Sequence, residues 1–291
     1  MPQAVYHAQR MRGGAQSHLM FCDDGCFYVV KFQNNPQHVR VLANEMLANS
    51  LAEYIGLPVP RFAPVEVRGE LIEVTPELHF ERVRGRVACA PGRHFGSRLP
   101  VDATREPIYD FVPDQTLALL ANREAFIGML LFDQWTCNAD ARQAVFLRSA
   151  ADSSRYQALM IDQGFCFNDG EWSFPDSPLR GLYPRLVVYQ GVTGWDSFEP
   201  WMSRLREMEW SQARRFAAGI PLAWYEANDE ALERLMDTLD RRRARLPELI
   251  ETVRRCSKNP FPNWRPEAVG CRLWALTGFP YSPQLTAHGR S

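Results

Sequence analysis

The sequence predicts an α+β protein with two lobes, a small β-rich N-terminal lobe and a larger α-rich C-terminal lobe. Three observations predict this fold class. Strand-like runs gather in roughly the first 80 residues, helical periodicity dominates after Gln115, and a stretch rich in Gly, Pro and Arg separates the two regions. We therefore expect an N-lobe over 1–84, a connector over 85–114, a C-lobe over 115–256 and a tail of unknown role over 257–291.

The composition of the chain supports a large folded core. Hydrophobic residues make up 46% of the 291 residues and aromatic residues 12%, which excludes disordered and collagen-like classes. The net charge of -1 argues against bulk binding of nucleic acid. Among the 33 basic residues only Lys31 and Lys258 are lysines, so each is a candidate for a role that arginine does not fill.

The sequence predicts no membrane segment. Residues 1–20 lack the apolar stretch of a secretory signal, and the longest apolar run, 127–132, is far below the ~20 residues of a membrane helix. The 7 cysteines are odd in number and form no CxxC pair, which argues against disulfides and against a cysteine zinc site. We therefore expect a cytoplasmic protein with reduced thiols.

A β-hairpin is the first regular element that we expect. Two short apolar runs, 19–22 and 26–32, flank a turn at Asp24-Gly25, which is the pattern of a tight hairpin. Just before it, residues 13–17 are small or polar, which suits a tight turn with an exposed backbone.

A helix over 35–55 is predicted to follow the hairpin. Asn35 suits the N-cap, Pro36 suits the first helical position, and apolar residues recur at helical spacing up to Gly56, which ends the helix. Glu45 lies at the border of this apolar stripe. Beyond the helix, 62–67 and 70–74 flank an Arg-Gly turn and predict a second hairpin.

The C-lobe is predicted to be mostly helical. A long helix is expected from Gln115 to about Asp133, followed by two short strands over 144–147 and 158–161. Further helices are expected over the segments 198–208, 212–218, 229–245 and 247–255. The tail has prolines and no clear period, so it is assigned no element.

Five features occur in the order that phosphoryl transfer from ATP requires. A small-residue turn lets backbone amides approach the phosphates, a lysine neutralises phosphate charge, and a glutamate from a neighbouring helix holds that lysine. One carboxylate orients the acceptor hydroxyl, and another holds Mg²⁺, which prefers oxygen ligands. Taken singly, each feature has an ordinary structural explanation, but their joint order favours a kinase. The five features are the turn at Gly13-Gly14, Lys31, Glu45, Asp140 and Asp162.

The sequence resembles the HipA-like kinase family over about residues 10–255. The loop at 132–140 is also similar, more distantly, to that of type II phosphatidylinositol 4-kinases. The resemblance implies a two-lobed protein-kinase-like fold that binds ATP and Mg²⁺. The motifs that carry it are Gly13-Gly14-Ala15-Gln16-Ser17-His18, Val29-Val30-Lys31-Phe32, Asn44-Glu45, Asn138-Ala139-Asp140 and Ile161-Asp162-Gln163-Gly164-Phe165.

The resemblance also implies a role for each site residue. Lys31 contacts the ATP phosphates and Glu45 pairs with Lys31. Asp140 is the catalytic aspartate, Asn138 in the same loop is a further candidate catalytic residue, and Asp162 is a metal ligand. The residues expected at the nucleotide phosphates, besides Lys31 and Glu45, are Gly13, Gly14, Ala15, Gln16 and Ser17.

One position departs from the pattern of the family. Related catalytic loops carry a metal-binding Asn five residues beyond the catalytic Asp, where this chain has Val145. The basic residue that usually follows the Asp directly is displaced to Arg142. Gln143, or else Asn138, is the candidate to supply the missing amide oxygen to the metal.

We therefore expect a Mg²⁺-dependent kinase that transfers the γ-phosphoryl group of ATP to a Ser or Thr hydroxyl of an unknown protein acceptor. Two alternatives stay open. One is a kinase of lipids or small molecules on the same fold. The other, prompted by Val145, is a nucleotide-binding regulator that transfers nothing.

Overall fold

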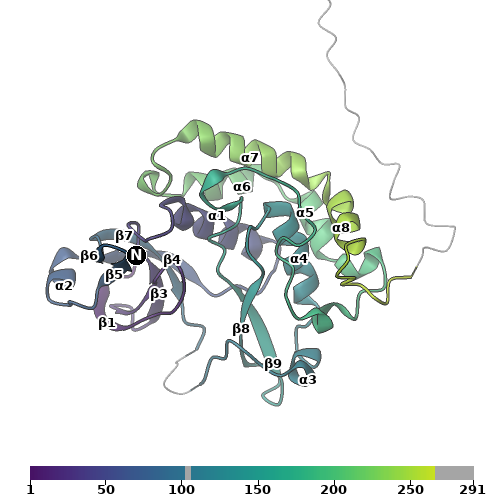
Figure 1. Ribbon diagram of the computed structural model, residues 1–291, viewed down its shortest axis with the longest axis horizontal. Coiled ribbons are helices and arrows are strands. Elements are labelled where there is room, and N and C mark those ends of the chain that lie inside the picture. The colour runs from purple at the N-terminus through teal and green to yellow at the C-terminus, as the bar shows by residue number, and fades with distance from the viewer. Residues whose placement is uncertain (102–105, 266–291) are drawn as a thin grey trace, which may run out of the picture.

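The computed structural model of the protein describes residues 1–101 and 106–265, and Figure 1 shows their division into two lobes. The larger sheet gathers on the N-terminal side, and the helices of the second half of the chain form the other lobe. This arrangement confirms the predicted α+β fold with a β-rich N-lobe and an α-rich C-lobe. The predicted tail lies outside the described residues from position 266 onward.

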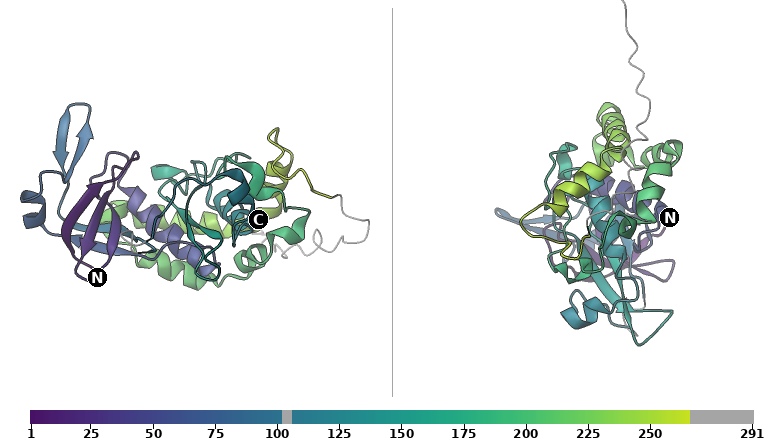
Figure 2. Two further views of the ribbon diagram at one scale, coloured as in Figure 1. Left: turned by 90° about the horizontal axis from the view of Figure 1, so that it is seen from below. Right: turned by 90° about the vertical axis from the view of Figure 1, so that its right-hand side faces the viewer.

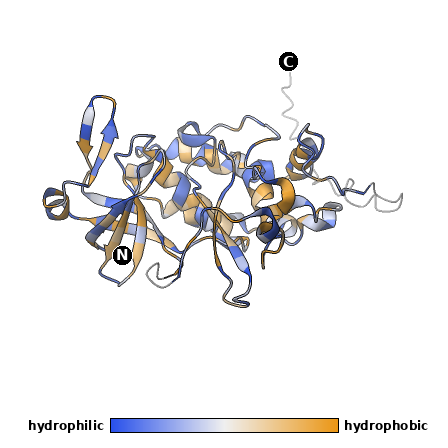
Figure 3. Ribbon diagram, turned by 60° about the horizontal axis from the view of Figure 1, so that its bottom comes forward, coloured by the Kyte–Doolittle hydropathy of each residue, from blue (hydrophilic) through white to orange (hydrophobic). Residues whose placement is uncertain are grey.

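The sheet of the N-lobe has five antiparallel strands in the order β1-β2-β3-β7-β4. The predicted hairpin is present, with β2 and β3 paired from His18 opposite Val30 to Phe21 opposite Phe27. Figure 3 shows hydrophobic and hydrophilic residues interleaved along these strands, as expected when one face is buried. The strands are β1 (Ala4–Arg10), β2 (His18–Cys22), β3 (Phe27–Lys31), β4 (Phe62–Val67) and β7 (Gly92–Arg98).

Helix α1 (Arg40–Tyr54) begins five residues later than predicted. Asn35 forms a turn instead of capping the helix, because its side-chain oxygen accepts a hydrogen bond from the Gln37 amide at 2.9 Å. The predicted end is confirmed, since Gly56 follows the helix with φ +79, a conformation that favours glycine. Almost the whole helix is buried, so Glu45 lies inside the protein and not at the border of a stripe.

Two predictions for the N-lobe are wrong. The segment 70–74 forms a short helix, α2 (Gly69–Glu73), so β4 has no hairpin partner there and pairs with β7. The predicted connector begins with strands, because β6 (Gly85–Ala88) pairs with β5 (His79–Arg82) in a hairpin that projects from the lobe (Figure 2), and β7 follows.

Strand β7 escaped prediction because its partners are far away in the sequence. Its residues Gly-Arg-His-Phe-Gly-Ser-Arg have weak strand propensity, and only pairing with β3 on one edge and β4 on the other makes them a strand. A Cβ at Gly96 would lie 2.4 Å from a methyl group of Val65, so glycine is required at this crossing point.

The predicted long helix of the C-lobe is two helices, α3 (Asp114–Ala118) and α4 (Ala125–Thr136). They are separated because the Asn122 side chain bonds both backbone groups of Ala158, which draws the chain out of helical geometry. The strand prediction is confirmed by the hairpin of β8 (Gln143–Arg148) and β9 (Tyr156–Ile161). The remaining helices, close to their predicted bounds, are α5 (Trp201–Glu207), α6 (Trp210–Ala218), α7 (Asp229–Arg243) and α8 (Leu246–Arg254).

Two hydrophobic clusters form the core. The smaller one fills the N-lobe and includes Met20, Val30 and Phe80. The larger one joins the apolar residues of α1, such as Leu42 and Leu47, to α4 and the other C-lobe helices. Helix α1 is therefore packed as part of the C-lobe core, although its sequence position places it among the N-lobe strands.

Four single turns of 3-10 helix complete the C-lobe: η1 (Asp169–Glu171), η2 (Leu186–Tyr189), η3 (Trp195–Phe198) and η4 (Leu222–Tyr225). Within the described part of the chain, no helix has both the length and the apolar character that crossing a membrane demands.

Candidate active site

A buried lysine lies where the two lobes meet. Lys31 is the last residue of β3 and is only 9% exposed. Its Nζ contacts Oε1 of Glu45, which lies on α1, and Oδ1 of Asp162 at 2.6 Å, just after β9. Residues that are 14 and 131 positions away from Lys31 thus share one ammonium group.

The charges of this cluster stabilise one another. Burial disfavours the charged form of Lys31, but the combined attraction of Glu45 and Asp162 outweighs it and raises the pKa of the ammonium group. Burial likewise disfavours the Asp162 carboxylate, but the nearby Lys31 charge lowers the pKa of Asp162 below its usual value. Burial raises the pKa of Glu45 above its usual value, and the nearby Lys31 charge opposes that rise. The lysine thus bridges two acidic side chains from different elements.

Backbone conformation at the end of β9 allows the close approach of Asp162. This residue adopts φ +61, in the left-handed region that is unusual for a residue other than glycine. A Cβ at Gly164 would lie 2.9 Å from Val41 Cγ1 and 3.5 Å from Lys31 Nζ. Glycine at this position therefore leaves the room in which Lys31, Glu45 and the segment after β9 meet.

The predicted catalytic loop, which follows α4, is held by a buried ion pair. Arg142 donates to both carboxylate oxygens of Asp133, at 2.8 and 2.5 Å, and both side chains are at most 2% exposed. Asn138 donates to Asp133 at 3.0 Å and accepts a hydrogen bond from the Asp140 amide at 3.1 Å. These contacts fix the backbone from the end of α4 to the start of β8.

The geometry distinguishes Asn138 from Asp140. Asn138 is 1% exposed and its two side-chain atoms bond within the loop, so the structure places it under the loop and not facing solvent. The Asp140 side chain is half-buried, and its carboxylate accepts from the Ala141 amide at 2.7 Å and from Gln143 Nε2 at 3.2 Å.

The β8–β9 hairpin brings the two predicted aspartates to the same end. Gln143 lies opposite Ile161 in the ladder, so Asp140 precedes one strand and Asp162 follows the other. Arg142 Nη1 donates to the Ile161 carbonyl oxygen at 2.7 Å, which joins the start of β8 to the end of β9. Gln143 is exposed, and Val145, two residues further along β8 and opposite Leu159, lies on the same face of the strand and is half-buried.

The small-residue turn joins β1 to β2. It is closed by a 2.7 Å hydrogen bond from the Met11 amide to the Ser17 carbonyl oxygen, and Gly13 has φ +121. Gly13 and Gly14 are exposed, while Ala15 and Ser17 are buried.

The Gln16 side chain exchanges two hydrogen bonds with the Glu81 backbone, at 2.9 and 2.8 Å. The side-chain contacts of Gln16 in this turn are therefore with Glu81, whereas Lys31, Glu45 and Asp162 contact one another.

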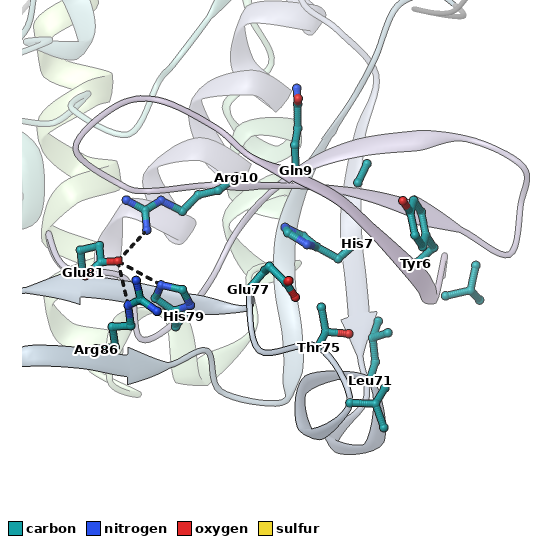
Figure 4. Close-up of a pocket in the computed structure, with 13 residues that line it drawn as sticks. Tyr6, His7, Gln9, Arg10, Leu71, Thr75, Glu77, His79, Glu81 and Arg86 are labelled. Carbon is teal, nitrogen blue, oxygen red and sulfur yellow. Dashed lines mark hydrogen bonds and ion pairs between the residues drawn. The ribbon is translucent and has the colours of Figure 1, made fainter.

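A groove of about 840 Å³ lies elsewhere on the N-lobe, between β1 and the β5–β6 hairpin (Figure 4). Among its lining residues, Glu81 accepts contacts from Arg10, His79 and Arg86. None of the predicted site residues lines this groove, so we place the candidate active site at the Lys31 cluster and the β8–β9 end instead.

Five buried polar residues at the site lie outside the set that the sequence interpretation assigned to catalysis, nucleotide binding or the metal. Asn44 on α1 donates to the carbonyl oxygens of Gly164 and Asp169 and accepts from Trp172 Nε1 at 2.7 Å. The available signal was polar side chains within apolar helical runs, such as Asn44 and Asp133, and a basic residue just beyond the loop. The five residues are Asn44, Asn49, Asp133, Arg142 and Gln163.

The architecture is that of protein-kinase-like phosphotransferases. It has an antiparallel N-lobe sheet with a lysine paired to a helix glutamate, followed by a helical lobe with a hairpin between two aspartates. The sequence model of the HipA-like kinases matches residues 6–170, more than half of the chain. The chain therefore belongs to the HipA-like kinase family and is a kinase.

Solved structures with the same fold are kinase-like. Hydra Fam20, solved with sugar, is 11% identical with a TM-score of 0.50, covering 89% of this chain and 86% of that one. The Golgi casein kinase is 11% identical with a TM-score of 0.54, covering 89% of this chain and 75% of that one. The same kinase with Mn/ADP bound has a TM-score of 0.52, with the same identity and coverage. No curated protein sequence matches the chain.

Proposed function

We propose that the protein transfers the γ-phosphoryl group of ATP, with Mg²⁺, to a Ser or Thr hydroxyl of a protein. The observation that carries this proposal is the buried ammonium group of Lys31, held between Glu45 of α1 and Asp162 beside the β8–β9 end. A phosphate chain needs a fixed positive charge, and phosphoryl transfer depends mostly on positioning and charge stabilisation.

Lys31 and Asp162 have complementary parts in nucleotide binding. In the structure Lys31 neutralises Asp162, but a bound phosphate chain competes for the same ammonium group. Glu45 keeps Lys31 in place while the Asp162 carboxylate becomes available to a metal ion. The backbone amides of Gly13 and Gly14, both exposed residues, are the candidates for further phosphate contacts.

The residues at the β8–β9 end fit Mg²⁺. Asp162 and Gln143 offer oxygen donors on neighbouring strand ends, and Mg²⁺ commonly uses one or two carboxylates together with substrate phosphates and waters. Four carboxyl groups, of Glu45, Asp133, Asp140 and Asp162, outnumber the two cations Lys31 and Arg142 around this end, which favours a bound cation. Bound there, the metal supplies charge neutralisation to the phosphate oxygens. The Golgi casein kinase, a structural neighbour, holds Mn and ADP, which supports nucleotide and divalent-metal use.

Asp140 is the group that we assign to the acceptor. Its carboxylate reaches the surface at the same end of the hairpin as Asp162, and its orientation is held by the Ala141 amide and by Gln143. A carboxylate in that position orients an incoming hydroxyl and accepts its proton as the phosphoryl group is transferred. Asn138 and Arg142 position the loop without facing the acceptor.

We also propose that the lobes keep their predicted order, with the N-lobe extended through β7 because β7 pairs with β3 and β4. The cytoplasmic location stays a prediction. It is supported by six described cysteines that are all free.

Transfer of labelled phosphate from ATP tests the proposal. We expect Mg²⁺-dependent label on protein acceptors that Asp140→Asn and Asp162→Asn each lower by at least about 100-fold. Asp152→Asn is the matched control, since Asp152 is exposed in the loop at the other end of the same hairpin. Label that persists in both site variants would contradict the assignment.

A second candidate function is a nucleotide-binding regulator without transfer. The observation that favours it is Val145, which occupies the position of the family's metal-binding Asn and lies in the β8 ladder. Tight ATP binding by the wild-type protein with no transfer to protein, lipid or small-molecule acceptors would select this candidate. Label on a lipid or small molecule alone would retain the kinase and replace the proposed acceptor.

A further inference from the structure

Two buried amide side chains connect helix α1 to the segment after β9. Gln163 Nε2 donates to Asn49 Oδ1 at 3.1 Å, although the residues are 114 positions apart. On the α1 side, Asn49 Nδ2 donates to Glu45 Oε2 at 3.0 Å and to the Glu45 carbonyl oxygen at 2.8 Å. Asn49 therefore holds the carboxylate oxygen of Glu45 that Lys31 does not use.

The other end of this connection reaches the catalytic loop. Gln163 Oε1 accepts a hydrogen bond from Arg142 Nη1 at 2.8 Å, and Arg142 is bound to Asp133 at the base of the loop. A continuous path of hydrogen bonds thus leads from the loop that carries Asp140 to the pair that holds the phosphate lysine. Its four middle members, Asn49, Gln163, Arg142 and Asp133, are each at most 4% exposed.

The charged groups at the two ends determine how the amides are oriented. The Glu45 carboxylate requires the amino group of Asn49, and the Arg142 guanidinium requires the carbonyl oxygen of Gln163. This leaves the Asn49 oxygen facing the Gln163 amino group, which is a matched donor and acceptor. Exchanging the oxygen and nitrogen of either amide would place buried donors against donors and acceptors against acceptors, so the path has a single hydrogen-bonding arrangement.

We propose that the Asn49–Gln163 amide pair is a positioning bridge, which sets the Lys31–Glu45 pair at a fixed place relative to the loop of Asp140. The inference rests on the proposed function, since positioning matters only if phosphate and acceptor meet there. Packing supports it, because the apolar residues of α1 belong to the same core as α4, and Asn44 ties α1 to Gly164. Helix α1 is thereby held against the catalytic loop by buried polar contacts as well as by apolar packing.

The chain offers an unusually clean test, because Lys31 and Lys258 are its only lysines. Acylation of the folded protein, followed by mass spectrometry, gives the reactivity of Lys31 relative to the exposed Lys258. We expect Asn49→Leu and Gln163→Met to raise this ratio about tenfold, because Glu45 loses the contact that holds its carboxylate against Lys31. Ser50→Ala is the control, since Ser50 is a buried polar residue of the same helix whose hydroxyl donates to the Met46 carbonyl oxygen, within α1 itself.

Kinetics of phosphoryl transfer give the second measurement. The two variants are expected to lower kcat by about 10- to 100-fold while the dissociation constant of ATP changes less than about threefold, because the phosphate lysine stays but is misplaced. The kcat of the double variant should be no lower than that of the slower single variant, since either substitution alone already breaks the bridge. Gln163→Glu retains the acceptor for Arg142 and removes the donor to Asn49, so it replaces Gln163→Met if that variant does not fold.

Unchanged Lys31 reactivity and kcat in folded variants, with only a lower melting temperature, would overturn the inference and leave the pair a structural contact. Independent, additive losses in the double variant would overturn it as well. If the wild-type protein transfers no phosphate, the proposed function fails, and the acylation ratio still decides whether the bridge holds Lys31.

Discussion

Replacing Arg142 by methionine is expected to lower the free energy of unfolding by about 4 kcal/mol. Arg142 makes four hydrogen bonds, two to Asp133 and one each to the Ile161 carbonyl oxygen and Gln163. Methionine fills similar space but leaves the Asp133 carboxylate, which has no solvent exposure, without its counter-charge. Removing one partner of a buried ion pair costs about 3–5 kcal/mol, a large part of the about 5–15 kcal/mol that holds a typical domain folded.

Urea unfolding of four proteins measures this effect: wild type, Arg142→Met, Asp133→Asn and the double variant. The double variant should recover at least about 2 kcal/mol relative to Arg142→Met, because asparagine carries no charge and still accepts from Asn138. Arg148→Met, at the exposed far end of β8, is the control and should change stability by less than about 1 kcal/mol.

The pH dependence of the Arg142→Met deficit provides a further check. Burial already raises the pKa of Asp133 in the wild-type protein, and loss of the arginine raises it further. An acid whose folded pKa exceeds its unfolded pKa loses stability as the pH rises between the two values. The deficit should therefore shrink as the pH is lowered. A cost below about 1 kcal/mol, or strictly additive effects in the double variant, would refute the assignment of a buried ion pair.

Three further predictions follow from the site and the N-lobe. Lys31→Arg keeps the positive charge, but the larger guanidinium does not fit beside Gly164, so the rate of phosphate transfer should fall at least about 100-fold. The control Lys258→Arg should leave that rate unchanged, and equal rates in the two variants would contradict the phosphate role of Lys31. Gly164→Ala should destabilise the protein by about 1–3 kcal/mol in thermal or urea unfolding, because the new methyl group meets Val41. The control is Gly69→Ala, whose methyl group meets nothing within 4 Å and which should therefore lose less stability than Gly164→Ala. His94 is buried; its ring accepts a hydrogen bond from the Gln33 amide and donates one to the Ala90 carbonyl oxygen, and burial lowers its pKa to about 4. As the pH falls from 7 to 5, the histidine of the unfolded chain takes up a proton before that of the folded protein, so the protein should lose about 2 kcal/mol of stability. His94→Gln should lose that part of the pH dependence, and an unchanged pH profile in unfolding experiments would show that His94 is not buried in its neutral form.

Much of the fold could be predicted from local patterns. The β2–β3 hairpin follows from its Asp-Gly turn and flanking apolar runs, α1 follows from its periodicity and its end at Gly56, and β8 and β9 follow from short apolar runs. What failed depended on distant partners. Strand β7 becomes a strand only between β3 and β4, and the break between α3 and α4 depends on Asn122 bonding to Ala158.

By itself the sequence determined which charges are present and their order, because turns, helix periodicity and motif spacing are local properties of the chain. It therefore predicted Lys31, Glu45, Asp140 and Asp162 as one set. Only the tertiary structure decided how that set is held. The bridge of Asn49 and Gln163, and the pairing of Arg142 with Asp133, join segments that are far apart in sequence. A buried amide or ion pair is stable only when its partner is present in the folded state, and no local pattern specifies that partner.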